Sequence, residues 1–186
     1  AEIDWVVEED FADIPALHPH VRRVIPVGLR RWRRRLIAPA TWCDMARFRR
    51  DLKIKTYDVV LDSQGLVKSA LLCLLASGAR HGMNRASLRE PLAARFYDVQ
   101  HAVPREQHAV ERNRQLAAAA LGYALGGECD YGLRAESSPP VPLSAPYAVL
   151  LTMTSRTDKL WPEERWREIG RTLAGRGIRP VSVVAD

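Results

Sequence analysis

Residues 57–72 read YDVVLDSQGLVKSALL, a short apolar strand followed by a turn and a segment with helical spacing. Buried parallel strands are short and rich in β-branched residues. Two stretches nearer the start of the chain have the same character, DWVVE at residues 4–8 and VIPV at residues 24–27. Because helical segments alternate with such strands, the sequence predicts a doubly wound α/β domain.

The helices of this domain are predicted from apolar spacing and from the scarcity of helix breakers. They cover residues 41–54, 66–76 and 106–122. The third interleaves Glu and Arg and ends at Gly122, a residue type that readily adopts the left-handed C-cap conformation.

The composition changes near residue 125. Residues 126–146 combine tandem glycines with serines and prolines and have no apolar period, which indicates a linker. A strand, YAVLLTMT, is predicted at residues 147–154, a helix from Pro162, and a further strand at residues 178–184. The predicted parts are an α/β domain over residues 1–125, a linker over 126–146, and the first βαβ unit of a second α/β domain over 147–186.

The chain carries 28 Lys and Arg residues against 22 Asp and Glu residues, a net charge of +6. This excess favours anionic partners, whether phospholipids, phosphorylated small molecules or nucleic acid. No apolar run approaches the roughly 20 residues that a membrane-spanning helix needs. The three cysteines are widely spaced and form no CxxC pair, which indicates reduced thiols in a cytoplasmic protein.

The run RRWRRR at residues 30–35 places five arginines within six positions, and no acidic residue adjoins it. In a helix Arg30, Arg33 and Arg34 would share one face, while Trp32 and Leu36 would point inward on the opposite face. Guanidinium groups suit bidentate binding of carboxylate and phosphate better than ammonium groups do. We therefore interpret the run as a site for a dense anion, with a solvated basic face as the alternative. The residues of this candidate site are Arg30, Arg31, Arg33 and Arg34.

The segment TMTSRTDK at residues 152–159 links the predicted strand to the predicted helix at Pro162. Ligands of doubly wound folds bind at the carboxyl ends of strands, and helix N-termini attract phosphate. The hydroxyls of Thr154 and Ser155 and the ammonium of Lys159 suit a diphosphate, and a simple polar turn is the alternative. Neither GxGxxG nor a Walker pattern is present, so a conventional dinucleotide or ATP site is not indicated.

A third candidate follows the strand at residues 57–61. Asp62, Gln64, Gly65 and Lys68 would line a cleft, or the segment would be a tight turn in which Gly65 packs closely. The histidines have no metal-ligand spacing, so neither a metal nor a cofactor is expected. No nucleophile elbow and no complete set of catalytic groups is visible.

Six stretches, in order along nearly the whole chain, resemble the lipopolysaccharide heptosyltransferases of type I in glycosyltransferase family 9. They are DWVVEEDFADIPALHP, VRRVIPVGLRRWRR, YDVVLDSQGLVKSALL, REPLAARFY from Arg89, QHAVERNRQLAAAALGY and TSRTDKLWPEERWRE. The resemblance implies a GT-B fold, in which two Rossmann-like domains face each other across a cleft. Residues 1–125 would bind the acceptor, and residues 147–186 would begin the domain that binds the nucleotide-sugar.

The resemblance also implies an activity and roles for the candidate residues. The family transfers L-glycero-D-manno-heptose from ADP-heptose to the Kdo of Kdo-lipid A, with inversion and without a metal, at the cytoplasmic face of the bacterial inner membrane. The arginine run and Arg89 match acceptor contacts, and an anionic membrane surface would be a partner. Thr154, Ser155 and Lys159 match contacts to the ADP diphosphate, where a cation would offset charge on the leaving group.

Two features of the family have no counterpart here. The general base is an Asp in a Gly-Asp loop after the first strand, which is expected upstream of Ala1, so no catalytic residue is expected in this chain. The Asp-Thr-Gly and His segment of the second domain is also absent. We expect a chain truncated at both ends, without the first strand, which alone would be inactive and fold poorly.

Two alternatives to this function are open from the sequence. One is the second heptosyltransferase or another core glycosyltransferase of the same family. The other is a basic nucleic-acid-binding module, which the net charge permits. The chain contains no recognised RNA or DNA motif, so no nucleic-acid partner is expected.

Overall fold

The computed structural model describes residues 2–134, 146–154 and 157–182 of the chain. The chain divides into two compact units, Ala1–Arg134 and Ala135–Asp186. The predicted linker at residues 126–146 lies partly outside the described residues, and its limits stay a prediction.

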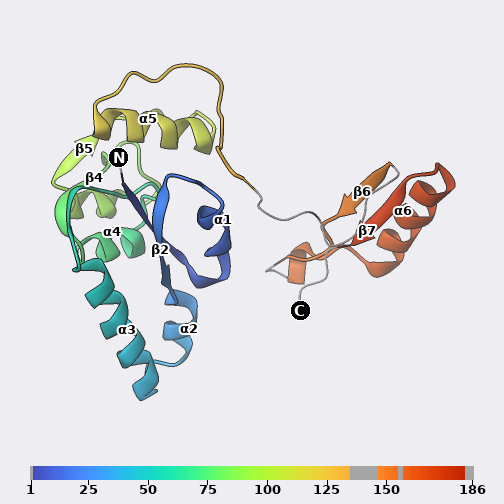
Figure 1. Ribbon diagram of the computed structural model, residues 1–186, viewed down its shortest axis with the longest axis horizontal. Coiled ribbons are helices and arrows are strands. Elements are labelled where there is room, and N and C mark those ends of the chain that lie inside the picture. The colour runs from blue at the N-terminus through green and yellow to red at the C-terminus, as the bar shows by residue number, and fades with distance from the viewer. Residues whose placement is uncertain (1, 135–145, 155–156, 183–186) are drawn as a thin grey trace. The chain divides into compact units, whose positions relative to one another are not determined.

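The first unit contains five parallel strands in two sheets (Figure 1). One sheet pairs β1 (Ile3–Glu8) with β2 (Val21–Val27). The other has the order β3 (Thr56–Leu61), β4 (Ser77–Met83) and β5 (Val99–His101). The three strands predicted in this part of the sequence, and the α/β class, are confirmed.

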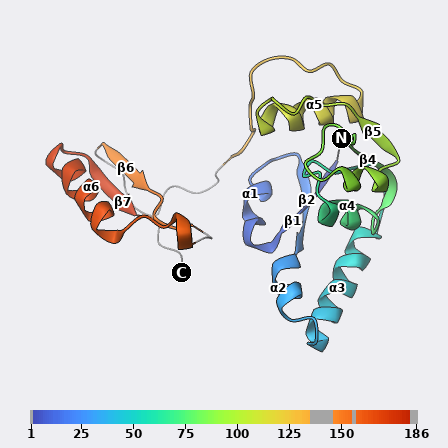
Figure 2. The ribbon, with the colours of Figure 1, turned by 180° about the vertical axis from the view of Figure 1, so that it is seen from behind.

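Helices connect these strands, as the alternation predicts. They are α1 (Asp13–Ala16), α2 (Leu29–Arg34), α3 (Pro39–Leu52), α4 (Val67–Cys73) and α5 (Ala109–Leu121), with short 3₁₀ turns η1 (Glu9–Phe11) and η2 (Pro91–Phe96). The predicted helices correspond to α3, α4 and α5 with shifted ends. Gly122 ends α5 with φ of 71°, in the left-handed conformation expected of it. In both views α5 lies at one end of the first unit and the turn between α2 and α3 at the other (Figure 1, Figure 2).

Two apolar clusters form the core of the first unit. The first joins α4, β4, η2 and α5, and its buried members are Ala70, Met83, Leu88, Ala93, Ala94, Tyr97, Val103 and Leu116. The second joins β2, α2 and α3, and its buried members are Ile25, Val27, Trp32, Phe48 and Leu52. The second cluster fixes the α2–α3 hairpin that carries the arginine run.

The second unit is a βαβ arrangement, as predicted. Strand β6 (Tyr147–Leu150) pairs in parallel with β7 (Arg179–Ser182), and α6 (Glu163–Gly175) connects them. A 3₁₀ turn, η3 (Thr157–Lys159), precedes α6. Strand β6 ends four residues earlier than the sequence predicts, and residues 183–184 of the last predicted strand lie outside the described residues. In the described part of the chain, no helix has the length and apolar character to cross a bilayer.

Candidate functional site

The arginine run forms helix α2, which is anchored by its tryptophan. Trp32 is buried and packs edge-to-face on Phe48 of α3, with ring centroids 5.7 Å apart. The arginines on either side of it are exposed. The predicted orientation of Trp32 is therefore confirmed. The predicted orientation of Leu36 is wrong, because α2 ends at Arg34 and the Leu36 side chain is 54% exposed.

Acidic residues from other elements neutralise part of the run, which the sequence did not indicate. Arg31 Nε lies 2.9 Å from Glu9 Oε1, and its Nη1 lies 2.6 Å from Asp44 Oδ2. These hydrogen bonds raise the pKa of Arg31, and the bond from Arg31 lowers the pKa of Glu9. Glu9 and Asp44 are 22 and 13 positions from Arg31, so only the fold brings them together.

The remaining arginines of the run differ in their surroundings. Arg30 lies 3.5 Å from Asp10 Oδ2, and its guanidinium lies over the ring of Phe11 at 5.7 Å. Among the described residues, Arg33 and Arg34 form no ion pair and no side-chain hydrogen bond. They are therefore the cations of α2 whose hydrogen-bonding capacity is open to an external anion.

Arg89 lies on a different segment, directly before η2. Its side chain is exposed, and it has no ion pair within the described residues. Its neighbour Glu90 accepts a hydrogen bond from the backbone N–H of Val67 at 2.8 Å, at the first residue of α4. No hydrogen bond or ion pair of the described chain connects Arg89 to α2.

The turn after β3 is organised by Asp62, whose side chain is buried. Its Oδ1 accepts hydrogen bonds from the backbone N–H groups of Gln64 and Gly65, at 2.9 and 3.1 Å. Its Oδ2 accepts from Ser69 Oγ at 2.8 Å and from the Tyr97 hydroxyl at 2.7 Å. Burial and the bond to Asp62 raise the pKa of Tyr97. The carboxylate thus has a structural role in the turn.

Gly65 makes the close approach that the tight-turn interpretation requires. Its φ is +67°, and a Cβ at this position would lie 2.5 Å from Leu88 Cδ2. Lys68 is exposed on α4. Neither of these two residues lines the cavity described next, whereas Asp62 and Gln64 do.

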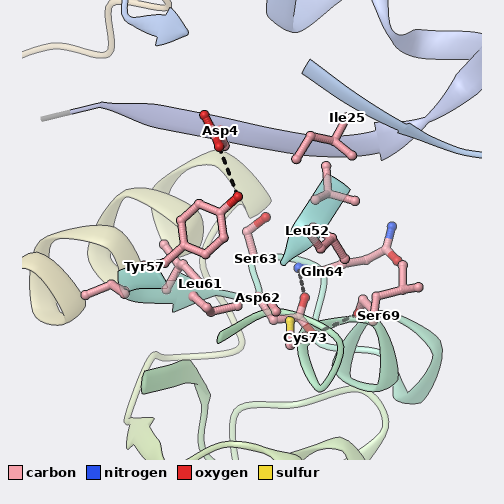
Figure 3. A pocket seen from close by; sticks show the side chains of 15 residues that line it. Asp4, Ile25, Leu52, Tyr57, Leu61, Asp62, Ser63, Gln64, Ser69 and Cys73 are labelled. Atoms are coloured by element: carbon pink, nitrogen blue, oxygen red, sulfur yellow. Dashed lines mark hydrogen bonds between the residues drawn. The ribbon is translucent and has the colours of Figure 1, made fainter. Parts of the chain in front are cut away.

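A cavity of about 190 Å³ lies between β1 and β3 (Figure 3). Asp4 on β1 faces Tyr57 on β3 across it, and the Tyr57 hydroxyl donates to Asp4 Oδ2 at 2.9 Å. Burial of Asp4 opposes its ionisation, but the hydrogen bonds from Tyr57 and Arg22 hold its pKa below the usual value. Cys73 also lines the cavity, and burial raises the pKa of its thiol to about 12, which disfavours the thiolate.

Sequence reasoning missed this cavity because its walls come from distant segments. Asp4 and Tyr57 are 53 positions apart, and nothing in the sequence pairs them. The cavity is lined mainly by apolar side chains of strands and of α4. In the described ranges, no group of three or more His, Cys, Asp or Glu side chains could hold a metal ion.

In the second unit, the predicted diphosphate segment lies between β6 and α6, as its position in the sequence requires. Thr154 is exposed in the irregular stretch after β6, and Lys159 is exposed at the end of η3. Ser155 lies outside the described residues. Glu163 and Glu164 occupy the first turn of α6, and Glu163 Oε1 lies 2.6 Å from Arg167 Nη2.

The sequence of the chain is similar to that of known proteins of one family. The model of glycosyltransferase family 9, the heptosyltransferases, matches residues 45–184. Lipopolysaccharide heptosyltransferase 1 of Escherichia coli K12 is 48% identical over 181 residues, which are 96% of this chain and 57% of that protein. The protein of the same name from Pseudomonas aeruginosa is 48% identical over 95% of this chain and 50% of its own length.

The fold also has a solved counterpart. The structure of E. coli heptosyltransferase WaaC with ADP superimposes with a TM-score of 0.82 at 43% identity, and covers all of this chain and 59% of that one. The expected GT-B class is thereby confirmed for the part of the fold that this chain contains. The chain spans about half the length of the curated relatives it matches. The matched residues, the shared fold and the identity to several relatives show that this chain belongs to glycosyltransferase family 9, the heptosyltransferase family.

Proposed function

We propose that the whole protein transfers L-glycero-D-manno-heptose from ADP-heptose to the Kdo of Kdo-lipid A in the synthesis of the lipopolysaccharide inner core. The observation that carries the proposal is the 48% identity to lipopolysaccharide heptosyltransferase 1 across 96% of the chain. The transfer is inverting and needs no metal: a Kdo hydroxyl attacks the anomeric carbon from the face opposite the diphosphate. The bond from that carbon to the diphosphate oxygen breaks and ADP leaves, while the proton of the Kdo hydroxyl passes to a general-base carboxylate of the whole protein.

The exposed arginines support the acceptor assignment. Kdo-lipid A carries carboxylates and phosphates, which guanidinium groups bind with charge-assisted hydrogen bonds. Arg33 and Arg34 supply such groups without first breaking an ion pair of the described chain. Arg30 and Arg31 would also contact the acceptor, although Arg30 is paired with Asp10 and Arg31 with Glu9 and Asp44. Arg89 adds a cation from the segment before η2.

The segment between β6 and α6 would bind the donor. Hydroxyls at Thr154 and Ser155 would donate to the diphosphate, and the Lys159 ammonium would offset the charge that develops on the leaving ADP. The complex of WaaC with ADP-2-deoxy-2-fluoro heptose, an analogue of the donor, is consistent with this substrate class.

Replacement Lys159→Ala should weaken ADP binding by about 1.5–3 kcal/mol, as expected when a charge-assisted hydrogen bond is lost. Titration calorimetry measures this, and an unchanged ADP affinity removes Lys159 from the donor site.

The acceptor lies in a membrane, so the protein would act as a peripheral protein at the cytoplasmic face of the bacterial inner membrane. The net charge of +6 suits that anionic surface. We expect no nucleic acid among the partners.

Turnover with two acceptors tests the proposal. The whole protein, supplied with ADP-heptose, should heptosylate Kdo-lipid A in the presence of a chelator, and the product should have the anomeric configuration opposite to the donor. Transfer only to an acceptor that already carries the first heptose would instead identify a heptosyltransferase II activity and reject the proposal.

A further inference from the structure

The turn between α2 and α3 and the first turn of α3 expose three large apolar side chains. Ile37 is 98% exposed, Trp42 60% and Leu36 54%. Ile37 is the most exposed large apolar residue among those the structure describes. We call Leu36, Ile37 and Trp42 the apolar tip. Exposed apolar residues that cluster in this way mark interaction surfaces.

The apolar tip is held in place by hydrogen bonds. The Trp42 indole N–H donates to the Leu36 carbonyl at 3.0 Å, and the Thr41 hydroxyl donates to the Arg35 carbonyl at 2.8 Å. The backbone N–H of Ala38 also donates to the Arg35 carbonyl, at 3.1 Å. Because these bonds close the turn, Ile37 cannot fold back onto the core without breaking them.

The position of the tip leaves it accessible. It lies at the end of the first unit opposite α5, beyond the strands (Figure 1, Figure 2). Its base is fixed, because Trp32 of α2 packs on Phe48 of α3 in the second apolar cluster. The tip is therefore a protrusion on a rigid hairpin.

The charges beside the tip indicate what it contacts. Arg33, Arg34 and Arg35 directly precede Leu36, all three are exposed, and none has an ion pair within the described ranges. Arginines beside exposed Trp, Ile and Leu are the combination that binds the interface of an anionic bilayer: apolar groups enter the acyl boundary while guanidinium groups contact phosphates. Tryptophan favours this boundary because its ring is apolar and its N–H is polar.

We propose that the apolar tip inserts into the interface of an anionic phospholipid bilayer, with Arg35, which the acceptor assignment does not include, on the lipid phosphates. This inference rests on the membrane location in the proposed function and adds the residues that make the contact. The lipid is the surrounding phospholipid, a ligand separate from the acceptor. One protruding tip of this kind gives reversible attachment that depends on both apolar burial and charge.

Vesicle binding tests the proposal with a matched control. The whole protein is mixed with vesicles of phosphatidylglycerol and phosphatidylcholine that contain no lipid A, and the bound fraction is measured by sedimentation. The double replacement Leu36→Ser with Ile37→Ser should weaken binding about tenfold, because two apolar side chains no longer enter the bilayer. The control is Ile54→Ser, at a residue 60% exposed beyond the end of α3, and it should leave binding unchanged.

Fluorescence provides a second measurement. Vesicles should shift the emission of Trp42 to shorter wavelength, and lipids with a nitroxide on the acyl chain should quench it. Both signals should be lost in Trp42→Phe. Vesicles of phosphatidylcholine alone should give a weaker signal, because Arg35 then faces no anionic headgroups.

The outcomes separate this inference from the proposed function. Heptose transfer to a water-soluble, deacylated acceptor should be the same for the double serine variant as for the unchanged protein. Vesicle binding that survives the double replacement overturns the inference, and so does an equal loss in Ile54→Ser. If the double replacement instead abolishes a dimer seen by sedimentation equilibrium, the tip binds a second copy and the inference is wrong. A failure of transfer with every Kdo acceptor would reject the proposed function and leave the vesicle result standing.

Discussion

The turn at Asp62 and the helix α2 both concentrate polar side chains, yet they use them in opposite ways. The Asp62 carboxylate is buried and accepts four hydrogen bonds within the protein. The arginines of α2 are exposed, and Arg33 and Arg34 have no ion pair in the described chain. A polar residue whose bonding capacity is satisfied inside the fold supports structure, whereas one that is exposed and unpaired can bind a ligand. Replacements at the two sites test this distinction.

Replacement Asp62→Ala should cause the largest loss of stability. It leaves the Tyr97 hydroxyl and the backbone N–H groups of Gln64 and Gly65 without their acceptor, whereas Ser69 can still donate to the Leu66 carbonyl. The free energy of unfolding should fall by about 3–4 kcal/mol. Urea unfolding measures it, and Arg33→Ala, which removes an exposed side chain of α2, should not change it. If both replacements lower the unfolding free energy equally, the distinction between a structural and a ligand-binding polar residue is wrong.

Replacement Gly65→Ala should have the next largest effect. It combines strain at φ of +67° with a collision against Leu88, and should cost about 2 kcal/mol of unfolding free energy. Gly122→Ala is the matched control, because φ there is +71° and nothing lies within 4 Å of the added Cβ. The difference between the two losses measures the Leu88 contact. If the losses are equal, that contact contributes nothing.

Arg33 and Arg34, which have no ion pair in the described chain, should affect catalysis and leave stability unchanged. Arg33→Ala with Arg34→Ala should raise the KM of the whole enzyme for Kdo-lipid A about tenfold and leave the KM for ADP-heptose unchanged. Arg31→Ala should behave differently, lowering the unfolding temperature at low salt and less at high salt, because it removes ion pairs to Glu9 and Asp44. A rise in both KM values in the double variant would contradict the acceptor assignment.

The histidines on β4 and β5 are half-buried, intermediate in burial between the buried Asp62 and the exposed arginines of α2. Replacing one of them should change the unfolding free energy least. His81 Nδ1 lies 3.1 Å from His101 Nε2, and their rings are stacked. Burial and the charge of His81 lower the pKa of His101, so the unfolded chain binds a proton more readily than the folded one. The unfolding free energy should therefore decrease as the pH falls below about 6.5. His101→Gln should flatten this part of the curve, and an unchanged slope would exclude His101 as its source.

Much of the fold could be predicted because the signals are local. The β-branched runs at β1, β2 and β3 predicted strands, and apolar spacing predicted α3, α4, α5 and α6. Strand β4 was missed because its sequence, SGARHGM, has little strand propensity of its own. It is nevertheless the middle strand of its sheet. Its glycine at position 82 leaves room for a neighbouring side chain, because a Cβ on Gly82 would lie 2.3 Å from the Tyr97 ring.

The candidate sites follow the same rule. The arginine run could be predicted because its members are adjacent in sequence. The partners of Arg31 and the cavity between Asp4 and Tyr57 could not, because they depend on contacts between distant segments. At Asp62 the sequence left a cleft and a tight turn open, and the hydrogen bond from Tyr97, 35 positions away, shows what the carboxylate does. The roles of Thr154, Ser155, Lys159 and Arg89 in binding stay predictions.

The hydrogen bonds that close the α2–α3 turn begin and end within residues 35–42. A loop that is closed by its own side chains should keep its shape when it is moved to another scaffold. Residues 29–52 also bring their own aromatic pair, Trp32 and Phe48, to hold the two helices together. This hairpin is therefore a candidate for transplantation onto an unrelated helical protein, where a chimera would show whether the segment is a self-sufficient module.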